Sequence, residues 1–133
     1  MALSQHKDPL EAAITAFNRG DYFDAAEKFE QSLALTEPER KDLVSALNRI
    51  AAALHLRFER GGRQSTINLL SQALISLEEL KPAHGGIDTE RLFGEISALV
   101  DDIRATPRDE QGLKHRTRLF LERRRAPRIK RAG

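Results

Sequence analysis

FNRGDYFDAAEKFE, the stretch from Phe17 to Glu30, decides the fold of this chain. Gly20 ends one predicted helix, and Asp21 begins the next helix one residue later. The second helix carries apolar side chains along one stripe, namely Tyr22, Ala25, Ala26, Phe29 and Leu33. Because small residues in this stripe let two helices approach closely, the stretch predicts a tight helical hairpin in an all-helical protein.

The helix signals continue on both sides of this hairpin. Asp8-Pro-Leu-Glu11 predicts the start of the first helix, and the second helix is expected to reach about Leu35. Thr36-Glu-Pro-Glu39 repeats the start signal and predicts a third helix. That helix keeps helical spacing of apolar residues for over four turns, at Leu43, Leu47, Ile50, Ala51, Leu54 and Phe58. It is therefore predicted to be the long central helix.

Three more helices are expected after the Gly61-Gly62 break. The fourth is stopped by Pro82, Asp88 caps the fifth, and Thr106-Pro107 opens the sixth. No segment shows sustained two-residue alternation, so strands are not expected. The sequence predicts the all-α class, as a compact bundle of five to six helices.

Composition excludes several classes of protein. The chain has 133 residues and no cysteine, which excludes disulfides, thiolate metal sites and a cysteine nucleophile. No apolar run approaches the roughly 18 residues that span a bilayer, and the first residues lack the apolar stretch of a signal peptide. These features predict a cytoplasmic protein without a transmembrane segment.

Charge divides the chain at Thr106-Pro107. Residues 107–133 hold ten Lys and Arg against three acids, a net of +7, whereas residues 1–106 hold twelve against seventeen, a net of −5. We therefore predict a helical bundle domain at 1–106 and a basic tail at 107–133, partly helical and then disordered after Pro127.

From Phe17 to about Arg104 the chain resembles the helical family known as domain of unknown function 309. The resemblance is carried by Gly20-Asp-Tyr22 with Ala26-Glu27-Lys-Phe-Glu30, and by Ser45-Ala46 leading into Ile50-Ala-Ala-Ala-Leu-His55. It implies an all-helical bundle and no established activity. The chain departs from the family at Ala26, Leu33 and Ser45, where family members have histidine, tryptophan and glutamine.

The hairpin also resembles one tetratricopeptide unit. A tetratricopeptide array needs a further matching unit about 34 residues on. The chain has only a partial match, at Gly61, Ala73 and Pro82. A tetratricopeptide-like protein-interaction scaffold is therefore the alternative fold and function.

One set of polar residues could carry chemistry, namely Glu27, Glu30 and His55. The two glutamates lie on neighbouring turns, and His55 would reach them if the second and third helices pack together. Such a cluster could serve a small metal-dependent hydrolase. The alternative interpretation is a structural His–Glu hydrogen bond or solvated acids. We predict no catalytic residues, metal site or cofactor.

The basic tail is the strongest functional feature of the sequence. Its predicted partner-binding residues are Lys114, Arg116, Arg118, Arg123, Arg124, Arg125, Arg128, Lys130 and Arg131. Arginine binds carboxylate and phosphate alike, so the expected partner is an acidic protein surface, another copy of the chain included, or nucleic acid. A solubilising tail without a partner is the alternative. The sequence thus favours a non-enzymatic binding or assembly module with a basic tether, with RNA or the ribosome as a special case.

Overall fold

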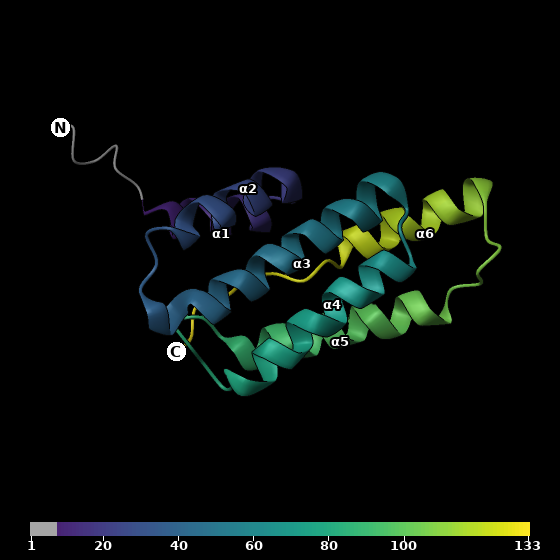
Figure 1. Ribbon diagram of the computed structural model, residues 1–133. Helices are drawn as coiled ribbons and strands as arrows, with labels where there is room; N and C mark the ends of the chain where they lie inside the picture. Colours follow the sequence, from purple (N-terminus) through teal and green to yellow (C-terminus); the bar gives the residue numbers. More distant parts are fainter. Residues whose placement is uncertain (1–7) are drawn as a thin grey trace.

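Six α-helices make up most of residues 8–133, the part of the chain that the computed structural model describes (Figure 1). They are α1 (Pro9–Asn18), α2 (Tyr22–Leu33), α3 (Lys41–Arg60), α4 (Gln64–Glu79), α5 (Thr89–Ala105) and α6 (Gly112–Arg124). Within this part of the chain only two isolated bridges have β geometry, so the predicted all-α class is confirmed. None of these helices is long and apolar enough to cross a bilayer. Residues 1–7, the start of the predicted bundle domain, lie outside the described residues.

α3 is the central helix, as its long apolar stripe predicted. It has 20 residues and packs against α2 on one side and α4 on the other, while α1 covers α2 and α5 covers α4 (Figure 1). Leu43, Leu47, Ile50 and Leu54 are fully buried along it. The core is therefore built mainly from aliphatic side chains, in keeping with the low aromatic content.

The α1–α2 hairpin forms as expected, with one difference at its turn. Gly20 has a φ of +86°, a left-handed conformation that a side chain at this position would disfavour. Asp8 accepts a hydrogen bond from the Leu10 amide at 3.0 Å and so caps α1. Asp21 occupies the cap position of α2, but its carboxylate pairs with Arg19 at 3.3 Å instead of capping the helix.

Two predicted helix starts are in fact helix ends. The Thr36 hydroxyl donates to the Ser32 carbonyl in the last turn of α2, and the Thr106 hydroxyl donates to the Asp102 carbonyl at the end of α5. A threonine bonded to the carbonyl four residues earlier closes a turn, and the residue before a proline avoids helical geometry. α3 therefore begins only after a 3₁₀ turn at Pro38–Arg40, and α6 begins after the loop of residues 106–111.

The expected disorder after Pro127 is wrong. Residues 125–133, here called the C-terminal strap, run back from α6 along the bundle toward the α4–α5 loop (Figure 1). The Asn18 side chain donates to the Ile129 carbonyl and accepts from the Ile129 amide, both at 2.9 Å. The Asp88 amide donates to the Lys130 carbonyl at 2.8 Å. The strap is therefore part of the fold and closes the bundle between α1 and α5.

The alternation of buried and exposed residues in the strap explains why it lies against the bundle. Pro127 and Ile129 are buried, Ile129 with 3% of its surface exposed, whereas Arg128 and Lys130 are exposed. This alternation is the period of extended chain with one face on a core. The run is too short to count as sustained alternation, and the surrounding charge conceals it.

Candidate binding groove at α6

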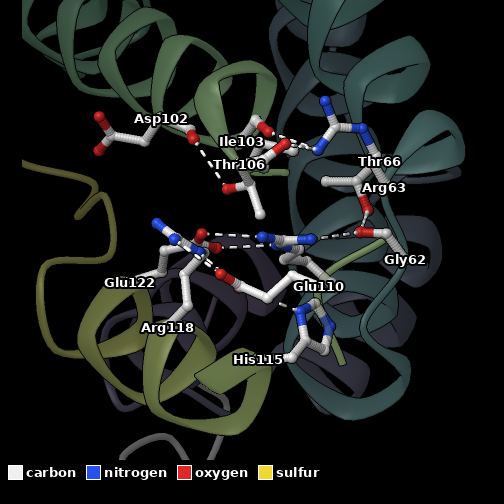
Figure 2. Close-up of polar contacts among 11 residues, drawn as sticks. Gly62, Arg63, Thr66, Asp102, Ile103, Thr106, Glu110, His115, Arg118 and Glu122 are labelled. Atoms are coloured by element: carbon white, nitrogen blue, oxygen red, sulfur yellow. Dashed lines mark hydrogen bonds and ion pairs between the residues drawn. The ribbon is translucent and has the colours of Figure 1, made fainter. Parts of the chain in front are cut away.

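A buried ion pair fixes α6 to the central helix. The Arg57 guanidinium donates to both carboxylate oxygens of Glu122, Nε to Oε1 and Nη2 to Oε2, each at 2.8 Å (Figure 2). The Arg57 side chain is 1% exposed and that of Glu122 is 5% exposed. Arg57 Nη1 also donates to the Gly62 carbonyl at 3.1 Å, which accepts from the Thr66 hydroxyl as well. Bidentate charge-assisted bonds are geometrically strict, so the orientation of α6 is determined at this point.

A second ion pair lies at the start of α6. Arg118 donates to the Glu110 carboxylate at 2.7 and 2.8 Å, and this hydrogen bonding, assisted by the positive charge, holds the pKa of Glu110 below its ordinary value of 4.5. His115 Nδ1 lies 3.7 Å from Glu110 Oε1, too far for a hydrogen bond (Figure 2). The other imidazole nitrogen lies 2.9 Å from the position that a Cβ on Gly61 would take, so only glycine fits at this contact.

The pKa of Glu110 predicts a pH-dependent contribution to stability. Because its pKa is lower in the folded than in the unfolded state, the contribution is present above pH 4.5 and is lost as the pH falls through the folded pKa. Glu110→Gln should therefore be less stable than wild type at neutral pH, with a gap that closes in acid. Urea unfolding across this pH range measures it, with Asp109→Asn as the exposed neighbouring control. A gap that stays constant into acid would contradict the assignment.

The loop between α5 and α6 is held by Arg63. Its guanidinium donates to the carbonyls of Ile103 at 2.9 Å and Thr106 at 2.7 Å (Figure 2). It also donates to the Arg104 carbonyl at 3.1 Å. These carbonyls lie at the C-terminal end of α5, where unsatisfied acceptors attract a cation. Arg63 therefore fixes the loop that carries Pro107 and Glu110 toward α6.

A groove of about 740 Å³ lies between the end of α5 and α6. Its apolar lining comes from Ala105 and Pro107 on one side and from Leu113 and Leu121 on the other. Leu113 is 79% exposed and Leu121 is 44% exposed, although both are leucines on a well-formed helix. Charged residues line the same groove, namely Asp102, Glu110, Lys114, Arg118, Glu122 and Arg125.

Four of the nine predicted tail cations form ion pairs or hydrogen bonds with other residues of the protein. Arg118 pairs with Glu110, and Arg131 pairs with Glu11. Arg128 donates to the Asn18 carbonyl at 3.1 Å. Arg123 donates to the Gly20 carbonyl at 3.1 Å, reaches Glu59 at 3.4 Å and lies over the rings of Tyr22 and Phe58. Carbonyl and carboxylate groups of the bundle already accept hydrogen bonds from these four cations, and their partner-binding role stays a prediction.

The other five predicted cations remain open. Lys114, Arg116, Arg124, Arg125 and Lys130 are exposed, and none forms an ion pair with another residue in 8–133. Four of them belong to α6 or the residue directly after it. Arg124 lies over the Phe120 ring at 5.9 Å, and that ring is itself 60% exposed.

The predicted polar cluster does not assemble. Glu27 and Glu30 are exposed on α2, and His55 lies beside Phe23 with their ring centroids 5.3 Å apart. Among the described residues, no three His, Asp or Glu side chains are grouped closely enough to hold a metal ion. The structural reason is that the inward stripe of α2 is apolar, which turns both glutamates toward solvent.

Arg57 and Glu122 are the key residues that our sequence reasoning missed. Arg57 stands three residues after Leu54 and seven after Ile50, which places it on the core stripe of α3. Glu122 stands three residues after Leu119 and seven after His115, on the inward stripe of α6. A single charge on the apolar stripe of α3 was the available signal, and α6 gave none because it has no continuous apolar stripe.

The comparisons with known proteins give a distant relative and no function. No family model matches the chain, and no solved structure matches it. An uncharacterized protein of Aquifex aeolicus (strain VF5) is 33% identical over 107 residues, which cover 80% of this chain and 31% of that protein. The chain therefore spans about a third of the length of this relative, and is similar to one part of it.

Proposed function

We propose that this protein is a non-enzymatic binding module that presents the groove beside α6 to an acidic partner. The observation that carries the proposal is the set of four open cations, Lys114, Arg116, Arg124 and Arg125, around exposed apolar side chains on one helix. Exposed leucines on a charged helix are typical of an interaction surface. The basic segment thus acts as a docked surface of the bundle, in place of the flexible tether expected from the sequence.

Two partner chemistries fit these cations, an acidic protein surface and RNA, the ribosome included. Arginine and lysine bind carboxylates and phosphates alike. RNA gains some support from Phe120, which is exposed between Arg116 and Arg124 and could stack on a base. Binding to RNA would weaken with salt at a slope of about 0.7 per phosphate contacted on single strands.

The proposal is tested with two simple polyanions, poly-L-glutamate and poly(U) RNA. We expect wild-type protein to bind at least one of them at low salt, and the variant K114Q/R116Q/R124Q/R125Q to lose about tenfold or more in affinity, since four charge contacts contribute up to about 1 kcal/mol each. Fluorescence anisotropy of labelled probes measures this.

The matched control removes four exposed cations elsewhere, in R40Q/K41Q/R60Q/R104Q. It should bind like wild type apart from a small effect of net charge. If the two variants lose equal affinity for the probes, the loss is due to net charge alone and not to the four cations beside the groove. Wild-type protein that binds neither probe would contradict the proposal.

We also propose that the chain is a diverged relative of the family known as domain of unknown function 309. In support, Gly20 and Tyr22 lie at the α1–α2 turn, and Ile50–His55 lie on the central helix, followed by the break at Gly61. A solved family member with the same helix order would support this relationship, and a different order would contradict it.

A further inference from the structure

We infer that the groove beside α6 binds an acidic amphipathic helix of another protein, an inference that rests on the proposed function and specifies its partner. Helices bind in this manner when a groove offers apolar contacts at the spacing of helical turns. Both the shape and the charge of this groove agree with such a partner.

The apolar surface runs along the groove in register with α6. Leu113, Thr117 and Leu121 follow one another at intervals of four residues, a row about 12 Å long. Ala105 and Pro107 form the facing wall. A partner helix lying along α6 would therefore insert apolar side chains from two or three successive turns between these walls.

The open charges flank this row on both sides. By helical spacing, Lys114 lies on the side of the row toward α5, and Arg116 lies on the other side. Arg125 follows Leu121 by four residues at the end of the row, and Arg124 lies beside that end. The groove carboxylates of Glu110 and Glu122 are already bound by Arg118 and Arg57, so they leave these cations available. An apolar row bordered by cations is complementary to a helix with an apolar stripe bordered by Asp and Glu.

The lining favours a helix over RNA. The groove lining combines aliphatic and charged side chains and contains no aromatic ring, whereas single-stranded RNA relies on aromatic side chains for base stacking. Phe120 is the exposed ring nearest in sequence, and it lies outside the groove lining.

The test is a selection of phage-displayed helical peptides against the full chain, followed by affinity measurements on the selected peptides. We expect them to combine Asp or Glu with apolar residues spaced by three or four positions. The variant L113S/L121S should lower their affinity by about tenfold or more, as expected for central apolar contacts. Both leucines are exposed, so this variant should keep the wild-type melting temperature.

The matched control is L35S/I75S, which changes two exposed apolar residues away from the groove, one in the turn after α2 and one on α4, and should leave peptide binding unchanged. Selection of peptides that lack acids, or that bind L113S/L121S as well as wild type, would overturn the inference. Binding of poly(U) that L113S/L121S abolishes would also overturn the inference, because it would place RNA in the groove. Self-association in sedimentation that L113S/L121S abolishes would do the same, because it would place a second copy of the chain there.

The binding module and its helical partner are separate claims, and different results contradict them. If poly-L-glutamate or poly(U) binds through the four cations while no acidic amphipathic peptide is selected, the helix inference is wrong and the binding module stands. If the four cations affect no probe and no peptide is selected, both are wrong.

Discussion

Glu122→Gln should destabilise the protein by about 3–5 kcal/mol, the usual cost of removing one partner of a buried ion pair. The Arg57 side chain is 1% exposed, so the substitution leaves a buried positive charge without its carboxylate. Because small domains are stable by only about 5–15 kcal/mol in total, this is a large share of the free energy of folding. The midpoint of urea unfolding, at unchanged m-value, measures the loss.

A double-mutant cycle separates the ion pair from packing. Arg57→Met combined with Glu122→Leu should restore most of the stability that either single change removes, since a well-packed apolar pair often equals a buried ion pair. The exposed pair of Lys28 and Asp24 is the control, and Asp24→Asn should cost no more than about 0.5 kcal/mol. A loss below about 1 kcal/mol for Glu122→Gln would show that α6 does not depend on this contact.

Ile129→Ala should destabilise the protein by about 2–5 kcal/mol, as for other buried isoleucines. Ile129 is 3% exposed and belongs to the same core cluster as the helices, although it lies only four residues from the end of the given sequence. Removing its side chain leaves a cavity beneath the strap. Thermal or urea unfolding of the full chain measures the effect.

Lys130→Ala is the matched control, because Lys130 is the exposed neighbour in the same extended segment. It should change stability by no more than about 0.5 kcal/mol. If the two variants unfold alike, the strap does not contribute a buried side chain to the core.

The helices were predictable from sequence because each combines a local signal with a long apolar stripe. Asp8, Asp88 and Gly61 act at helix ends as their residue types predict, and the stripe of α3 identified the central helix. Thr36 and Thr106 were misread because a threonine one or two residues before a proline can begin one helix or close the preceding one. Which of these occurs depends on where the chain turns, and neighbouring residues alone do not determine that.

The groove was not predictable, because it depends on long-range contacts. α6 has no continuous apolar stripe, and a buried pair between Arg57 and Glu122 holds it in place in combination with Arg63 at the loop. These residues are separated by tens of positions in the sequence, so only the folded chain shows that they meet. The sequence showed that the segment is basic, but it did not show that Arg118, Arg123, Arg128 and Arg131 contact groups of the bundle itself.

Hydrogen exchange of the strap tests most directly the central claim, that the chain after α6 is part of the fold. The amides of Ile129 and Ala132 donate to the Asn18 side chain and the Gly86 carbonyl, and the Asp88 amide donates to the Lys130 carbonyl. We predict that all three exchange slowly, together with the amides of the core helices. Exchange of the Ile129 and Ala132 amides at the rate of an unstructured peptide would contradict this account.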